Sequence, residues 1–126
     1  MVKITTEPID PSQAYGLIAA SGAGSVVFHY AVVKPMAGAG GTTSFIDYSS
    51  VGNTEDELNH IAVSLSAEFA VEDIVLIRRT GRPGLGEIIS LVAASAPNSE
   101  DAFAACKTGI SRLKKMKTIA KHEVCS

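Results

Sequence analysis

The sequence predicts one α+β domain, residues 1–126, with a largely antiparallel sheet and helices packed on one side of it. Runs rich in β-branched residues alternate with two segments in which apolar residues recur every three or four positions, as on one face of a helix. Some strand runs are joined by connections too short to hold a helix, which favours antiparallel hairpins. A chain of 126 residues, 46% hydrophobic, can bury one core and is too short for two domains.

The first half of the chain is expected to give three strands and one short helix. Val2 to Thr6 can form a short strand, and Asp10-Pro11 starts a helix with proline in its first turn. Ser25 to Val33 is the first long strand, apolar enough to be buried on both faces. After a glycine-rich loop, Thr42 to Tyr48 resumes as a strand, which we expect to lie antiparallel to the previous one.

The second half predicts two longer helices and two further strands. Thr54-Glu-Asp-Glu57 has the spacing of a capping box, and the helix that it opens should run to about Ala70. Ile74 to Ile77 and the run from Glu87 to Ser95 are predicted strands. The glycines between them, Gly81 to Gly86, indicate a tight turn.

The last helix is expected to organise the rest of the chain. Asn98 and Ser99 are typical N-terminal caps for it. Its apolar residues recur at three- and four-residue spacing and predict a buried face of Phe103, Cys106, Ile110 and Leu113. Its final turns and the basic tail expected after them hold six of the eleven basic residues, namely Lys107, Arg112, Lys114, Lys115, Lys117 and Lys121.

This basic cluster has two explanations. In a chain whose net charge is −2, so local an excess of positive charge indicates a bound anion. The commoner explanation is a solvated helix end whose cations complement the helix dipole, and composition alone favours it about two to one. His29 lies inside an apolar strand, where a structural histidine is commoner than a catalytic one. The turn at Gly81 to Gly86 joins strands and so lacks the geometry of a phosphate loop.

Composition also excludes several classes of function. The sequence has no apolar run of about 18 residues and no signal-peptide pattern, so we expect a cytoplasmic protein without membrane association. Its mild acidity argues against nucleic acid as the main partner. Cys106 and Cys125 do not make a disulfide framework or a metal-ligand pattern, and no metal site is expected.

Several short motifs span most of the chain at specific spacings. They are Arg78-Arg79-Thr-Gly81, Leu85-Gly86-Glu87, Ser95-Ala96-Pro97, Ala102-Phe103-x-Ala105-Cys106, Arg112-Leu113-Lys114, Ile119-x-Lys121-x-Glu123 and the opening Ile4-Thr-Thr-Glu-Pro-Ile-Asp10. Together they resemble the large catalytic subunit of molybdopterin synthase, the MoaE family. The resemblance implies a MoaE-like fold of the α/β hammerhead type.

The resemblance also implies an activity and partners. In that family a dimer of large subunits binds two small, ubiquitin-like sulfur carriers of the MoaD type. The C-terminal Gly-Gly thiocarboxylate of the carrier enters a pocket of the large subunit, and its sulfur passes to cyclic pyranopterin monophosphate to form the dithiolene of molybdopterin. The implied protein is therefore a homodimeric sulfurtransferase of molybdenum cofactor biosynthesis that needs no cofactor of its own.

Carried over by motif, the resemblance assigns Lys114 and Lys121 to catalysis, and Lys121 also to substrate binding. Lys34 takes the place of the family's arginine at the end of the first long strand and is implied to bind substrate. Asn98 and Ser99 stand where the family has a His-Arg pair, which makes them substrate-binding positions with different side chains. The alternative is a diverged, catalytically weak member that serves as a carrier-binding or regulatory module.

Overall fold

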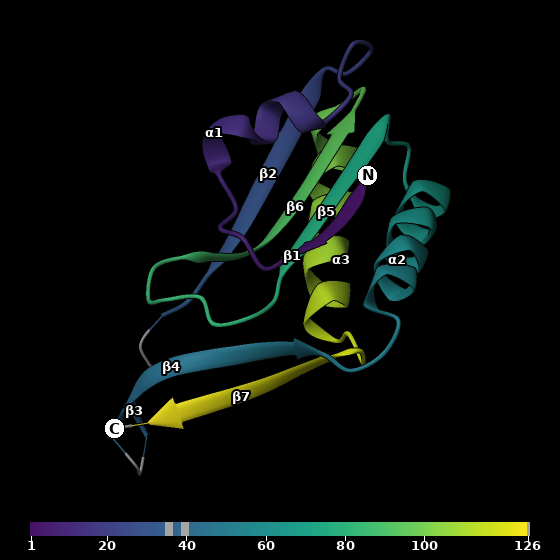
Figure 1. Ribbon diagram of the computed structural model, residues 1–126. Coiled ribbons are helices and arrows are strands. Elements are labelled where there is room, and N and C mark those ends of the chain that lie inside the picture. Colours follow the sequence, from purple (N-terminus) through teal and green to yellow (C-terminus); the bar gives the residue numbers. More distant parts are fainter. Residues whose placement is uncertain (35–36, 39–40, 126) are drawn as a thin grey trace.

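A computed structural model describes residues 1–34, 37–38 and 41–125 of the protein, which form two sheets and their flanking helices (Figure 1). In chain order the elements are β1 (Val2–Thr5), α1 (Pro11–Ala14), the 3-10 turn η1 (Tyr15–Leu17), β2 (Ser25–Val32), β3 (Ala37–Gly38), β4 (Gly41–Ser50), α2 (Thr54–Glu68), β5 (Asp73–Arg79), β6 (Ile88–Ala96), α3 (Ser99–Lys114) and β7 (Ile119–Cys125). The predicted α+β class is confirmed, and β3 and β7 are strands that the sequence did not predict. Among the described residues, no helix is both long and apolar enough to cross a bilayer.

The larger sheet has the strand order β1-β5-β6-β2. Its β5–β6 and β6–β2 pairs are antiparallel, and β1 adds to β5 in parallel. β6 is buried from Ser90 to Ala96, as its apolar run predicts. β2 is only half-buried over Ser25 to Ala31, and Val32 is exposed. The expectation that this strand is buried on both faces is wrong for the single chain, because β2 is the edge strand and its neighbours cover it incompletely.

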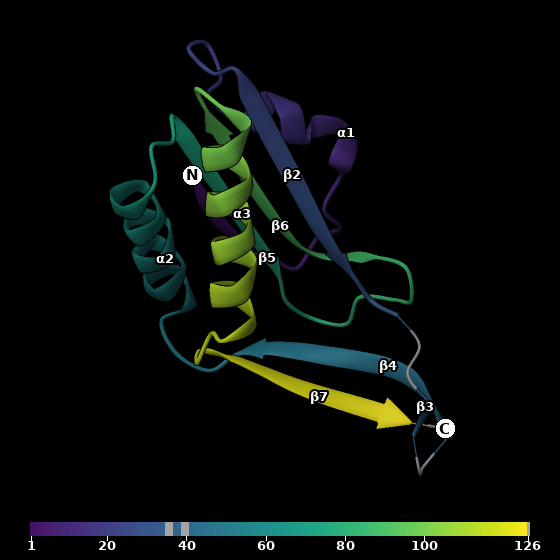
Figure 2. The ribbon, with the colours of Figure 1, turned by 180° about the vertical axis from the view of Figure 1, so that it is seen from behind.

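The two long helices cover one face of this sheet (Figure 2), and α1 lies on the other (Figure 1). Leu58 and Leu65 of α2 pack with α3 on the strands, whereas Ala14 of α1 joins a separate cluster on the opposite face. The predicted packing of helices on one side therefore holds for α2 and α3 only. Asp10 caps α1 by accepting a hydrogen bond from the Ser12 N–H at 2.9 Å, as the sequence predicts.

α3 buries a narrower face than the one predicted. Its buried residues are mostly small, namely Ala102, Ala105, Cys106, Gly109 and Leu113. Phe103 is 63% exposed, so its place in the predicted stripe is wrong. The helix lies so close to β6 that a Cβ at Gly109 would come within 2.9 Å of Val92 Cγ1, which leaves no room for large side chains between them.

Cys106 lies in this tightly packed face. Its side chain is buried, and Sγ donates a weak hydrogen bond to the Val92 carbonyl at 3.5 Å. Burial raises the pKa of the Cys106 thiol to about 11, because an apolar environment disfavours the thiolate.

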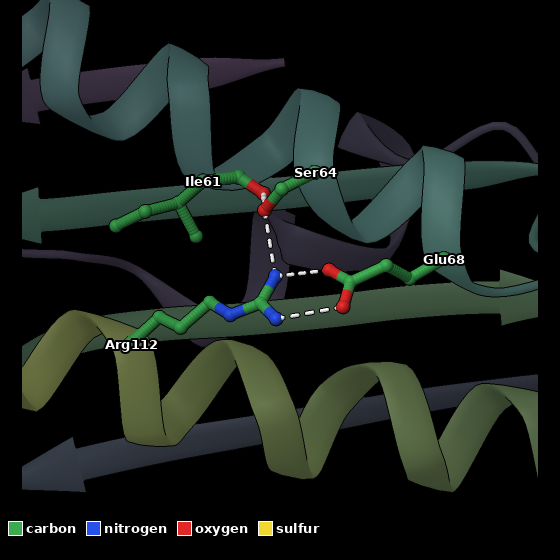
Figure 3. Close-up of polar contacts among 4 residues, drawn as sticks. All are labelled: Ile61, Ser64, Glu68 and Arg112. Carbon is green, nitrogen blue, oxygen red and sulfur yellow. Dashed lines mark hydrogen bonds and ion pairs between the residues drawn. The ribbon is translucent and has the colours of Figure 1, made fainter.

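Arg112 joins α3 to α2 (Figure 3). Its Nη2 donates to Glu68 Oε1 at 2.9 Å, and Nη1 donates to the other Glu68 oxygen and to Ser64 Oγ, the latter at 2.7 Å. Ser64 Oγ in turn donates to the Ile61 carbonyl at 2.7 Å. Arg112 is therefore a link between helices, and its charge is compensated by Glu68 rather than left for an anion.

The second sheet corrects two predictions about strand pairing. β4 pairs with β3 and β7, not with β2 as predicted, and the segment expected to be a basic tail is the strand β7. Tyr48 stands opposite Lys121 and Ser50 opposite Ile119 in this antiparallel ladder. A local pattern cannot reveal such a pairing, because the two strands are far apart in the sequence and neither is a purely apolar run.

Glu57 fixes the start of β7 to α2. Its carboxylate accepts hydrogen bonds from the Lys117 N–H at 2.9 Å, the Thr118 N–H at 3.0 Å and the Thr118 hydroxyl at 2.6 Å. The predicted capping box at Thr54 to Glu57 is therefore wrong. Asn53 is the N-cap and accepts from the Asp56 N–H at 3.1 Å, which frees Glu57 to reach the turn between α3 and β7.

A second connection joins β4 to the loop between β5 and β6. Tyr48 N donates to the Gly81 carbonyl at 2.8 Å, and Gly81 N donates to the Tyr48 carbonyl at 2.7 Å. Gly81 has φ of 90° and Gly86 has φ of 81°, a region in which other residues are strained. The loop between β5 and β6 runs from Thr80 to Glu87. It is longer than the predicted tight turn, because Gly81 pairs with Tyr48 of the second sheet.

We expect Glu57→Gln to lower the free energy of unfolding by about 1–3 kcal/mol, since it weakens hydrogen bonds that end on a charged acceptor. Burial alone would raise the pKa of Glu57, but the hydrogen bonds from Thr118 and Lys117 outweigh it and lower the pKa. The difference between wild type and variant should therefore be complete above about pH 4.3 and vanish as the pH falls through the lowered pKa.

Urea denaturation of both proteins between pH 3 and 7 measures this difference. Glu55→Gln, in the same helical turn and exposed, is the matched control and should change stability by no more than about 0.5 kcal/mol. A pH-independent loss in Glu57→Gln would show that the carboxylate charge is irrelevant to the junction.

Candidate active site

A basic cleft lies where the C-terminal end of α3 meets the second sheet. It consists of three adjoining hollows of about 270, 370 and 100 Å³, and Lys114 and Ile89 line all three. We call this region the lysine cleft. Its walls come from α3, β2, β5, β6, β4 and β7, so it exists only because the second sheet is attached to the first.

The structure brings three of the predicted site residues to this cleft. Lys114 is the last residue of α3 and follows Leu113, which is buried. Lys121 stands opposite Tyr48 across the β4–β7 ladder, and directly paired side chains project from the same face of a sheet. Lys34, shortly after β2, lines the largest hollow together with Lys114 and Lys121. All three lysines are exposed in the single chain.

The charged side chains that line the cleft are all positive among the described residues. Its walls hold Lys34, Arg78, Lys114 and Lys121, and none of the described residues that line it is acidic. The other walls are largely apolar, with residues such as Ile46. A concave surface with one sign of charge and apolar walls concentrates its field on a ligand of the opposite sign. The cleft can therefore bind an anion that carries a flat or apolar body.

Asn98 and Ser99 lie outside the lysine cleft of their own chain. They stand at the start of the 16-residue helix α3 that ends at Lys114, about 24 Å away at 1.5 Å per residue. Asn98 Oδ1 accepts from the Asp101 N–H at 2.8 Å, and Asn98 Nδ2 donates to the Asp101 carboxylate at 2.9 Å. Their contact with a substrate in the cleft would require a second copy of the chain.

Sequence reasoning missed three further residues that line the cleft, namely His29, Tyr48 and Arg78. The Arg78 guanidinium carbon lies 4.5 Å from the centroid of the Tyr48 ring. His29 was expected to be structural, yet its Nδ1 is buried without a hydrogen-bond partner among the described residues. These three residues come together because of how their strands pair, and the sequence does not reveal that pairing.

Comparison with known proteins decides the family. The family model for the MoaE protein matches residues 4–116. The chain belongs to the MoaE family. This MoaE protein is similar to the molybdopterin synthase catalytic subunit of Cereibacter sphaeroides, with 32% identity over 105 residues that cover 83% of this chain and 70% of that protein. It is 27% identical to the subunit of the same name from Staphylococcus carnosus over 123 residues, which cover 97% and 81% of the two chains.

Solved structures share the fold of this MoaE protein. Molybdopterin synthase from Staphylococcus aureus superposes with a TM-score of 0.88 at 24% identity, covering 98% of this chain and 90% of that one. A complex of subunits 1 and 2 of the molybdopterin-converting factor from Helicobacter pylori contains a chain that matches with a TM-score of 0.79 at 15% identity, covering 98% and 84%. These likenesses confirm the MoaE-like fold that the motifs implied.

We expect Asn98→Ala to lower the free energy of unfolding by about 1 kcal/mol, because it removes the acceptor that caps α3. Chemical denaturation measures this loss. Ser99→Ala, one residue later and exposed, should stay within about 0.5 kcal/mol of wild type. Equal losses in the two variants would mean that the Asn98 side chain is not the cap.

Proposed function

We propose that this MoaE protein is the catalytic subunit of a molybdopterin synthase. It takes sulfur from the C-terminal thiocarboxylate of a small MoaD-type carrier ending in Gly-Gly and transfers it to cyclic pyranopterin monophosphate, which becomes molybdopterin. Relatives that bear the name of this subunit and match over most of both chains support the assignment. The structural observation that carries it is the meeting of Lys34, Lys114 and Lys121 in a cleft without acidic neighbours among the described residues.

The reaction brings two anions together, the thiocarboxylate of the carrier and the phosphate of the pterin. Sulfur forms a bond to a carbon of the pterin as a carbon–oxygen bond at that carbon breaks, and water then cleaves the bond between sulfur and the carrier's carbonyl carbon, so that the carrier leaves as a carboxylate. Two such transfers, each from a fresh thiocarboxylate, supply the two sulfurs of the dithiolene. Ammonium groups suit both stages, because they offset the repulsion between the anions and stabilise an oxyanion at the carbonyl carbon. We assign this role to Lys114, with Lys121 and Lys34 holding the pterin.

Enclosure of the site must come from its ligands. Lys114 and Lys121 are exposed in the single chain, where water screens their charge. A carrier tail and a pterin that fill the cleft would exclude this water and strengthen both interactions.

We expect Lys114→Ala to reduce the rate of dithiolene formation by about 10²-fold or more, as loss of a positioned catalytic group does. The assay supplies thiocarboxylated carrier and cyclic pyranopterin monophosphate to the purified protein. Lys115→Ala is the matched control, because Lys115 is exposed and does not line the cleft, and it should change the rate little. Equal losses would favour a basic helix end that only complements the dipole. An inactive wild type would favour the carrier-binding module without turnover.

We further propose that the protein is a homodimer and acts in the cytoplasm. The half-buried edge strand β2 and the distance of Asn98 and Ser99 from the cleft support a dimer, since a second copy could cover the strand and bring these residues to a substrate. Light scattering at micromolar concentration should give twice the mass of 13.1 kDa. A strictly monomeric mass would contradict the dimer and any contact of Asn98 or Ser99 with the substrate.

A further inference from the structure

We propose that Arg78 binds an oxyanion at the inner end of the lysine cleft, either the phosphate of the pterin or the terminal carboxylate of the carrier. This inference rests on the proposed function and adds a contact to it. Arg78 lies at the end of β5 and lines the hollows of about 270 and 100 Å³ together with Lys114. It is thus positioned to hold the same ligand as the lysine.

Arg78 differs from the other arginines in lacking an acidic partner. Among the described residues, Arg78 forms no ion pair, and its Nε, like that of Arg79, is buried without a hydrogen-bond acceptor. Each other arginine has a carboxylate: Arg79 has Glu87 at 3.0 Å, Arg82 has Asp47 at 2.8 Å, and Arg112 has Glu68. The guanidinium of Arg78 is therefore the one in the described chain whose charge an acid does not compensate.

Burial makes this lack of a partner costly. Burial lowers the pKa of Arg78, and its interaction with Tyr48 only partly offsets the effect. An arginine nevertheless stays charged in proteins, so the cost remains in the folded state. A half-buried charge without an acidic partner is destabilising, and an anion that enters the hollow would compensate it. Binding of an anion beside Arg78 would therefore remove this energetic cost.

Tyr48 holds the guanidinium in place. The Tyr48 side chain is buried, its backbone is fixed by the two hydrogen bonds to Gly81, and its ring centroid lies 4.5 Å from the Arg78 guanidinium carbon. Stacking on an aromatic ring orients a guanidinium, whose fork of N–H groups can then bind two oxygens of one phosphate or carboxylate. The lysines of the cleft supply charge but lack such a fork.

His29 provides an independent indication that the occupant is polar. Its Nδ1 is buried without a partner among the described residues, and the side chain lines the hollow of about 100 Å³ with Arg78 and Ser90. In the sheet register Ala31, Ser90 and Arg78 form the row next to His29, on the face that carries α3. Buried polar atoms nearly always have partners. Two unsatisfied nitrogens around one hollow therefore favour a ligand with oxygen acceptors.

The test measures the affinity of full-length Arg78→Met for two probes separately, cyclic pyranopterin monophosphate and a carrier ending in Gly-Gly. Methionine keeps much of the length of arginine and removes its charge. We expect a roughly 10- to 100-fold loss of affinity for one probe, the range for a hydrogen-bonded charged contact, and a change within about threefold for the other. Loss for the pterin identifies the phosphate as the ligand, and loss for the carrier identifies the carboxylate.

Two controls separate binding from structure. Lys115→Met removes an exposed charge outside the cleft and should bind both probes as wild type does. Arg78→Lys keeps the charge without the fork and should lose about 5- to 10-fold for the same probe. Without ligand, Arg78→Met should melt no lower than wild type, because it removes a half-buried charge that lacks an acidic partner.

The possible failures are distinguishable. If Arg78→Met and Arg78→Lys bind both probes with wild-type affinity, the role of Arg78 is refuted and the proposed function stands. If Arg78→Met melts well below wild type while Arg78→Lys binds both probes normally, Arg78 is a structural residue and the inference is wrong. If wild type binds neither probe, the proposed function fails, and this inference fails with it.

Discussion

The attachment of the second sheet to the first is the constraint on which the site depends. Glu57 holds the start of β7 through the backbone N–H groups of Lys117 and Thr118, and Tyr48 pairs with Gly81 at the other side. Between these two connections the β4–β7 ladder faces the end of α3, so that Lys121 lies in the same cleft as Lys114. Lys34 and Arg78, which are far from these two lysines in the sequence, line the same cleft, so the site depends on the two connections that Glu57 and Gly81 make between the sheets.

The sequence predicted the elements whose signal is local. The Asp10 and Asn98 caps, the apolar run of β6 and the presence of helices α2 and α3 each depend on neighbouring residues, and the structure confirms them. Pairings over long distances could not be read in this way. The sequence predicts a basic tail in place of β7 and a capping box that includes Glu57, and both predictions are wrong because the partners of β7 and Glu57 come from another part of the chain. Phe103 fitted the helical period but faces away from a crowded contact.

The site was predicted in part for the same reason. Short motifs pointed to Lys114, Lys121 and Lys34, and the structure places all three in one cleft. The motif that contains Arg78 indicates no role for it, because that role depends on its surroundings: a tyrosine ring from the other sheet and no ion pair among the described residues. Only the three-dimensional structure reveals that the charge of Arg78 has no acidic partner. His29 likewise became informative once its Nδ1 proved to lack a partner there.

The packing of α3 has a chemical consequence for a protein proposed to handle activated sulfur. A thiolate within reach of a thiocarboxylate would compete with the reaction by attacking the carrier's carbonyl carbon, which forms a thioester with the carrier and expels the sulfur as sulfide before it reaches the pterin. Cys106 is enclosed between α3 and β6, and with a pKa near 11 it stays a thiol at neutral pH. The close contact between α3 and β6 therefore keeps Cys106 unreactive, so that it does not compete for the carrier's thiocarboxylate.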